Sequence, residues 1–235
     1  MIELRKFETL GSANHGWLDA RHHFSFASYH DASRVNWGSL RVWNDDIIQA
    51  GTGFPTHPHE DMEIITYVRE GAITHTDSMG NEGRTEAGDV QVMSAGTGVR
   101  HSEYNREDKD TTLFQIWIIP DERGGEPSWG AAKFPKGNRA GQFVPLASGA
   151  ANDDALPIRA NARVLGATIK AGESVTYDTS VDRHLYLVPA TGNIQISDAG
   201  GHVEANARDG VAITGMDSVT ITALEDSELV LVDAA

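Results

Sequence analysis

The chain contains no cysteine among its 235 residues. It therefore has no disulfide, no thiolate metal ligand and no cysteine nucleophile, so any metal must be held by histidine and carboxylate side chains. Long apolar runs are also missing: no stretch of 18 apolar residues occurs, and the N-terminal MIELRKFETLG has no apolar core after its charged residues. These absences argue against a membrane span or a secretory leader, and we expect a cytoplasmic protein with no membrane partner.

Basic residues are scarce relative to acidic ones. The chain has 19 lysines and arginines but 34 aspartates and glutamates, which gives a formal charge of −15. Nucleic-acid binding depends on clustered basic side chains that neutralise phosphates, and the sequence has no basic run. Direct nucleic-acid binding is therefore not expected, whereas the acidic surface is compatible with basic protein partners.

Short apolar or alternating segments recur along the chain and predict β-strands. They are rich in Val, Ile, Thr and aromatic residues, and Gly, Asn or Asp separates them, as in sandwiches and barrels. The segments are SLRVW, EIITYV, VQVMSA, LFQIWII, VTYDT, HLYLVPA, NIQISD, VAIT, SVTITAL and ELVLVD. Between Ile119 and Arg163 the pattern gives way to Gly, Pro, Ala and charged residues, which predicts a connection between domains. We expect an all-β protein with domains at residues 1–135 and 136–235.

Two pairs of metal-ligating residue types occur at strand spacing. His57 and His59 are two residues apart, and so are His101 and Glu103. Residues i and i+2 of a strand point to the same face, so two such strands side by side would direct three imidazoles and one carboxylate into a barrel. One isolated His-x-His pair is often an ordinary strand feature, but two pairs together are harder to explain without a metal.

These nitrogen and oxygen donors suit Fe(II), Mn, Co, Ni, Cu or Zn and exclude a thiolate-type structural zinc site. Four ligands leave two positions open on an octahedral ion, as in iron oxygenases where substrate and dioxygen meet at one metal. Glu63 has the same strand parity as His57 and His59. We expect it to support the ligands through hydrogen bonds or a salt bridge, with direct ligation left open.

The other histidines are assigned no metal role. His22 and His23 are adjacent, so on a strand they face opposite sides and cannot ligate one ion together. Isolated histidines are usually surface or hydrogen-bonded residues, and we expect this of His15, His30, His75, His184 and His202.

Glycines predict an internal repeat. Two glycines 20 residues apart, with a third 17 or 18 residues later, occur in each half: Gly51, Gly71 and Gly88, then Gly172, Gly192 and Gly210. A fixed spacing is typical of repeated architectures. Superposing the halves on these glycines places four residues opposite the four candidate ligands, namely Asp178, Ser180, Ala223 and Glu225. We therefore expect a second barrel that lacks the imidazoles.

The quoted residues resemble a known family. Gly51, His57-x-His59, Glu63 and Gly71 resemble the first cupin motif, with one extra residue before Gly71. The segment MSAGTGVRHSEYN is similar to the pirin family, in which a His-Ser-Glu stretch supplies the last two ligands. The resemblance extends from NHGWLDARHHFSFASY through RVWNDD and THPHEDMEI to the second barrel. It implies a bicupin: two tandem β-barrels, with a metal in the N-terminal barrel and none in the C-terminal one.

For bacterial members of this length, the resemblance also implies quercetin 2,3-dioxygenase activity. A flavonol-like aromatic would bind an open metal position through its deprotonated hydroxyl, because coordination lowers the hydroxyl pKa, and dioxygen would then add. The heterocyclic ring would open with release of CO. His57, His59 and His101 would hold one divalent ion, with Fe(II) favoured and Mn, Ni, Co, Cu and Zn open, and Glu103 would be both ligand and proton acceptor.

A second hypothesis stays open at this point. Eukaryotic pirins resemble transcription co-regulators, so the chain could be a metal- or redox-sensing regulatory protein that acts through protein partners. A degenerate cupin without metal is the weakest alternative, since both ligand pairs are intact. We expect a monomer.

Overall fold

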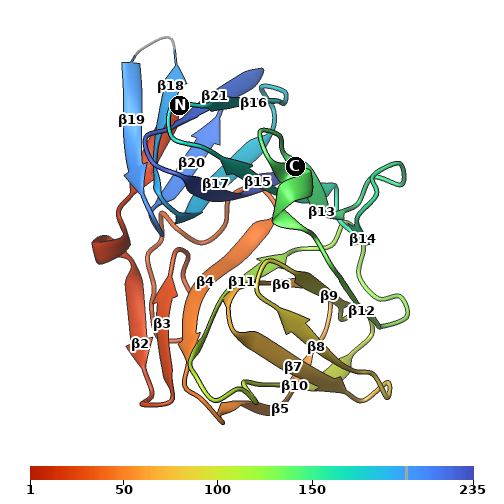
Figure 1. The fold of residues 1–235 in the computed structure, drawn as a ribbon. Helices are drawn as coiled ribbons and strands as arrows, with labels where there is room; N and C mark the ends of the chain where they lie inside the picture. The colour runs from red at the N-terminus through yellow and green to blue at the C-terminus, as the bar shows by residue number, and fades with distance from the viewer. Residues whose placement is uncertain (199–200) are drawn as a thin grey trace.

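The computed structural model of the protein describes residues 1–198 and 201–235, and this part consists almost wholly of β-strands (Figure 1). Its helical segments are two short 3-10 turns, η1 (Phe7–Thr9) and η2 (Lys136–Arg139). The predicted all-β class is confirmed. No helix in the described ranges is long and apolar enough to cross a membrane.

Two antiparallel sheets form the first barrel, in the lower half of Figure 1. The larger sheet has the strand order β12 (Ser128–Ala132), β9 (Val90–Ser94), β6 (Glu63–Glu70), β11 (Thr111–Ile118), β4 (Leu40–Ile48), β3 (Leu18–His22) and β2 (Gly11–Asn14). The smaller sheet has the order β5 (Gly53–His59), β10 (Val99–Tyr104), β7 (Ala72–Asp77) and β8 (Glu82–Glu86).

The second barrel repeats this plan in the upper half of Figure 1. Its larger sheet has the order β1 (Ile2–Arg5), β20 (Gly210–Thr214), β17 (His184–Thr191), β22 (Ser227–Ala234), β15 (Ala162–Ile169), β13 (Val144–Ser148) and β14 (Leu156–Pro157). Its smaller sheet has the order β16 (Ser174–Asp178), β21 (Ser218–Ala223), β18 (Asn193–Asp198) and β19 (Gly201–Asn206). The two small sheets match strand for strand, which confirms the internal repeat and the bicupin fold.

The connection between the barrels contains more structure than the sequence pattern predicts. Strand β12 pairs with β9 of the first barrel, and β13 pairs with β15 of the second. Both lie toward the edges of their sheets, where short strands with Gly or Pro are tolerated. Strand β1 at the N-terminus pairs with β20 and so belongs to the second barrel's sheet. We propose residues 1–135 and 136–235 as the two domains, with β1 of the first domain paired into the large sheet of the second.

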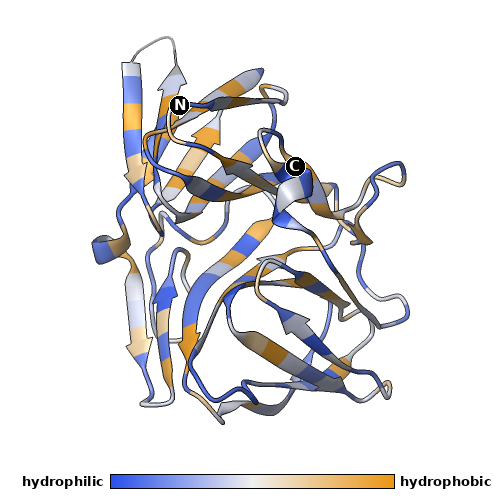
Figure 2. Ribbon diagram, viewed as in Figure 1, coloured by the Kyte–Doolittle hydropathy of each residue, from blue (hydrophilic) through white to orange (hydrophobic). Residues whose placement is uncertain are grey.

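The two large sheets pack face to face and share one core. Trp43 and Phe114 from the first barrel lie in the same buried apolar cluster as Tyr186 and Val230 from the second. Along many strands hydrophobic and hydrophilic segments alternate, as expected where each face of a sheet has a different environment (Figure 2). This shared core fixes the two barrels against each other.

The interiors of the two barrels differ. In the second barrel, 16 buried apolar residues form one cluster, whereas the apolar clusters inside the first contain six and four. The buried polar residues of the first barrel include His75, His101, Glu103, Gln91 and Gln115. The first barrel therefore encloses a polar site where the second has an apolar core.

Strand pairing corrects the residues that were expected opposite the ligands. Ile196 lies as far after Gly192 as His75 lies after Gly71, so the two residues correspond. His75 pairs with Glu103, and Ile196 pairs with Ile221, so Ile221 corresponds to Glu103. Two residues earlier on the same strands, Val219 corresponds to His101. Val219 pairs with Tyr177 of β16 as His101 pairs with His57 of β5, so Tyr177 corresponds to His57 and Thr179 to His59. The glycine superposition was wrong by one residue in β16, because β5 has a bulge between Phe54 and His57 that β16 lacks. It was wrong by four in β21, because fewer residues separate Gly210 from Val219 than separate Gly88 from His101.

The His23 side chain is fully buried where the two barrels meet. Its Nδ1 lies 2.9 Å from the Tyr186 hydroxyl, and burial, followed by the charge of Arg5, holds its pKa well below the ordinary value. Protonation therefore favours the unfolded chain. Stability from this residue is complete above the unfolded pKa of about 6.5 and is lost as the pH falls below it.

We expect His23→Gln to reduce the acid sensitivity of folding. Between pH 7.5 and 5.5 one such histidine costs the wild type about 1.4 kcal/mol of unfolding free energy, and the variant lacks this loss. Chemical denaturation at both pH values measures the difference. Tyr186→Phe is the control: it is less stable at both values but keeps the wild-type pH dependence. Equal pH dependence of His23→Gln and wild type would contradict the assignment.

Candidate metal centre

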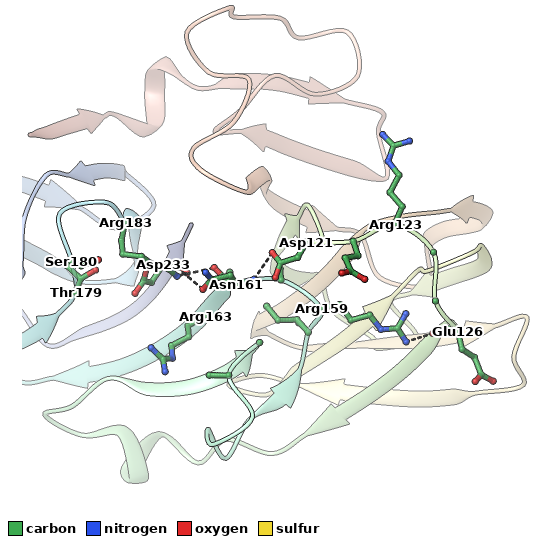
Figure 3. A pocket seen from close by; sticks show the side chains of 18 of the residues that line it. Asp121, Arg123, Glu126, Arg159, Asn161, Arg163, Thr179, Ser180, Arg183 and Asp233 are labelled. Carbon is green, nitrogen blue, oxygen red and sulfur yellow. Dashed lines mark hydrogen bonds and ion pairs between the residues drawn. The ribbon is translucent and has the colours of Figure 1, made fainter.

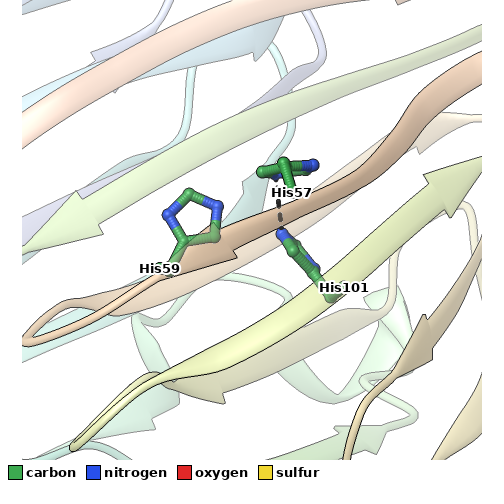
Figure 4. Close-up of side chains that lie close together, drawn as sticks. All are labelled: His57, His59 and His101. Atoms are coloured by element: carbon green, nitrogen blue, oxygen red, sulfur yellow. Dashed lines mark hydrogen bonds between the residues drawn. The ribbon is translucent and has the colours of Figure 1, made fainter.

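The predicted histidines converge between two neighbouring strands (Figure 4). His57 and His59 lie on β5, and His101 lies opposite His57 on β10. One nitrogen from each ring lies within 4.8 Å of the others, which forms a group able to hold a metal ion. The ring centroids are 4.5 to 5.0 Å apart. The strand-parity argument is thus confirmed for the imidazoles.

The orientation of His57 is fixed from its own strand. Its Nδ1 lies 2.8 Å from the carbonyl oxygen of Pro55, which can only accept a hydrogen bond. Nδ1 must therefore carry the proton, and Nε2 is left with a lone pair. This tautomer follows from the hydrogen-bond network.

A longer chain fixes the orientation of His101. His75 Nε2 lies 2.9 Å from Asp77 Oδ2, and His75 Nδ1 lies 3.3 Å from His101 Nδ1. If His75 donates to the Asp77 carboxylate, its Nδ1 accepts, and His101 Nδ1 must donate. The Nε2 atom of His101 then carries no proton and presents a lone pair as well. Such carboxylate–imidazole chains behind a metal ligand orient it and raise its basicity.

Two lone pairs consequently face each other. The Nε2 atoms of His57 and His101 are 3.0 Å apart, and neither carries a proton in these tautomers. Protonation of His101 is disfavoured, because burial, followed by the charges of His57 and His75, lowers its pKa to about 3. Burial, followed by the charges of His101 and His57, lowers the pKa of His59 to about 4. Neutral imidazoles are the form that binds metal. The arrangement therefore suggests a divalent metal ion.

Glu103 lies deeper, on the floor of the barrel. It is grouped with His75 and His101 as a possible ligand set and is absent from the group of three histidines. Its Oε1 accepts a hydrogen bond from Gln91 at 2.7 Å, and its Oε2 accepts one from Gln115 at 2.6 Å. His101 is the residue common to both groups, so the four predicted ligands form a chain rather than one compact cluster.

Glu63 does not support this site. Its carboxylate accepts a hydrogen bond from Ser94 at 2.5 Å and another from the backbone of Arg159 in the second barrel, and burial raises its pKa. Strand parity fails here because the chain turns at Asp61, which has a positive φ of 49°, and β6 then enters a different sheet. The amides of Gln91 and Gln115 occupy the supporting role expected of Glu63.

Several residues of the site were missed from the sequence. His75 was expected to be an isolated histidine, yet it is fully buried between Asp77 and His101. His75 and Asp77 are two residues apart on one strand, which is the same signal that identified the other pairs. His22 and His23 do face opposite sides, toward Asn44 and Tyr186 respectively.

The histidines open into a cavity of about 390 Å³. Its walls include the aromatic rings of Phe26, Phe54 and Trp117, with His59 edge-on to Trp117. Most of the lining surface is apolar, and its polar side chains include Asn44, Asp46 and Gln115 as well as the candidate ligands. Such a mostly apolar cavity with a few convergent polar groups is typical of a small-molecule site.

A larger cavity of about 920 Å³ lies where the barrels meet (Figure 3). Three of its four arginines are engaged: Arg183 pairs with Asp233, Arg163 pairs with Asp153, and Arg159 donates to the carbonyl of Glu126. None of its lining residues is a histidine. The candidate metal ligands line the smaller cavity instead.

Comparisons with known proteins show what the two halves of the chain are similar to. A family model described as Pirin matches residues 3–118, and one described as quercetinase C-terminal cupin domain matches residues 145–234. The chain is 64% identical to a pirin-like protein of Caulobacter vibrioides, with 100% of both chains covered, and 42% identical to quercetin 2,3-dioxygenase of Escherichia coli, with 99% of this chain and 98% of the other covered. The solved structure of bacterial pirin YhhW from Escherichia coli in complex with nickel(II) has a TM-score of 0.92 at 41% identity, covering 100% of this chain and 99% of that chain.

We expect His75→Leu to weaken metal binding by about 10- to 100-fold, because His101 loses the acceptor that fixes its tautomer. Competition with a chromogenic chelator, using nickel(II), measures the affinity. His15→Leu is the matched control, since His15 lines the same cavity but belongs to neither ligand group. An unchanged affinity in His75→Leu would show that the chain behind His101 has no influence on the ion.

Proposed function

Because the chain belongs to the pirin family, we propose that it is a metal-dependent dioxygenase that opens the heterocyclic ring of a flavonol such as quercetin with dioxygen and releases CO. The observation that carries the proposal is the group of three histidines, with the Nε2 atoms of His57 and His101 3.0 Å apart, in the wall of a cavity with aromatic side chains. The names of the relatives as quercetin 2,3-dioxygenases support the choice of substrate.

We assign His57, His59, His101 and Glu103 as the metal ligands. Three imidazoles and a carboxylate suit a divalent first-row ion, and we propose Fe(II) because the reaction uses dioxygen. When bound, the ion would supply Lewis acidity toward the flavonol hydroxyl and a site where substrate and dioxygen meet. Pro55 and the Asp77–His75 pair would keep the imidazole lone pairs directed at it.

Glu103 is the proposed proton acceptor. Its two oxygens accept hydrogen bonds from Gln91, Gln115 and Thr66. A carboxylate offers about four acceptor positions, so one remains for the ion or for the proton of the substrate hydroxyl. The two amides hold the carboxylate in place during that transfer, as a general base requires.

The cavity suits a flat aromatic substrate. Phe26, Phe54 and Trp117 provide apolar and aromatic surface, and closure by these rings would limit water at the reacting atoms. A flavonol combines a planar aromatic body with a hydroxyl for the metal. Both features match the walls and the ligand group.

The direct test is turnover by the purified, Fe(II)-loaded protein. We expect quercetin loss to match oxygen uptake and CO release, and His101→Ala to reduce the rate to that without enzyme. Exposed Glu60→Ala is the control and keeps full activity. Absence of turnover in the wild type with iron, nickel, cobalt or manganese would overturn the proposal.

Metal retention by alanine variants distinguishes the role of Glu103 from that of Glu63. We expect Glu103→Ala to lose bound metal on dialysis, whereas Glu63→Ala keeps it, because Glu63 contacts Ser94 and Arg159 instead of the ligand group. Elemental analysis after dialysis gives the metal content per chain. Equal retention by the two variants would remove Glu103 from the ligand set.

A further inference from the structure

Asp46 is a carboxyl group in the wall of the metal cavity. It lies on β4, is 2% exposed, and lines the cavity together with His57, His101 and Glu103. It belongs to neither group of possible metal ligands. Its neighbour Asp45 points to the opposite face, where it pairs with Arg69 and Arg208.

No hydrogen bond within residues 1–198 and 201–235 satisfies the Asp46 carboxyl, and its Oδ1 is fully buried and without a partner. The residues beside it in the sheet explain why: Ala20 on β3 and Leu113 on β11 have no side-chain donor. By contrast, the neighbouring Asn44 is engaged by His22, and Glu103 has three donors. Of the two buried carboxyl groups that line this cavity, Asp46 is thus the one without a donor.

An unpartnered buried carboxyl is costly, whether ionised or neutral, and such groups in native proteins usually have a functional reason. Leucine would suit the apolar neighbours at no such cost. Burial, followed by the charges of Asp45 and Glu103, raises the pKa of Asp46 well above its ordinary value, which agrees with the lack of donors. The open face of the carboxyl is the cavity, so a ligand is the partner that the geometry allows.

We propose that Asp46 binds a hydroxyl group of the aromatic ligand, at an oxygen other than the one that the metal holds. This inference rests on the proposed function and narrows its substrate class to flavonols that carry a further hydroxyl. The two residues directly beside Asp46 in the sheet, Ala20 and Leu113, offer no polar group, so the Asp46 carboxyl fixes the position of the hydroxyl there. Asp46 is a specificity-determining residue in this scheme.

The test compares two ligands on the nickel-loaded protein under anaerobic conditions. Quercetin carries several hydroxyls, whereas 3-hydroxyflavone carries only the one next to the ring carbonyl. We expect Asp46→Leu to weaken quercetin binding about tenfold, which corresponds to one hydrogen bond, and to leave 3-hydroxyflavone binding within about twofold. Fluorescence quenching measures both affinities, and elemental analysis checks the metal content.

Asp46→Asn is the conservative variant and guards against misfolding of the leucine protein. An amide keeps a donor and an acceptor, so it should restore most of the preference for quercetin. Equal changes for both ligands, or no change for either, would overturn the role of Asp46 and leave the proposed function standing. Failure of the wild type to bind either flavonol would overturn both.

Discussion

The alternation of side chains across one sheet is the constraint on which the rest of the structure depends. A polar row crosses the large sheet of the first barrel and faces the site: His22, Asn44, Gln115, Thr66 and Gln91. The next residues along the same strands, among them Trp43, Ile116, Ile65 and Val92, face the other way into the core shared by the barrels. A slip of one residue in any strand would exchange the two environments, so the apolar core also fixes the register of the site.

This division explains why two barrels are needed. A barrel that holds imidazoles, amides and carboxylates in its interior gives up much of the apolar burial that would stabilise it. The first barrel recovers stability by packing the outer face of its large sheet on the second barrel. The second barrel has no such interior to protect: Val219 and Ile221 fill the positions of His101 and Glu103. The second barrel thus stabilises the first through the core that the two large sheets share.

Much of the site could be predicted because it depends on spacing within a strand. His57 with His59, and His101 with Glu103, share faces for the same local reason, and the ten predicted strand segments all form strands. Relations that cross a turn could not be predicted in this way. Glu63 follows a turn with positive φ at Asp61 and enters another sheet, and the glycine superposition failed in β16 because β5 contains a bulge that β16 lacks. His75 reaches His101 only through pairing of β7 with β10, which no local pattern reveals.

The two contacts that orient the candidate metal ligands illustrate the same distinction and connect the proposed metal binding with folding. Pro55 acts on His57 from two residues away, while Asp77 acts on His101 through His75 and a neighbouring strand. Both contacts place a proton on Nδ1 and leave Nε2 bare, and burial opposes protonation of His101. Folding therefore brings together lone pairs that repel each other until a cation lies between them. A metal that binds this arrangement and not the unfolded chain would stabilise the fold by an amount that increases with its affinity.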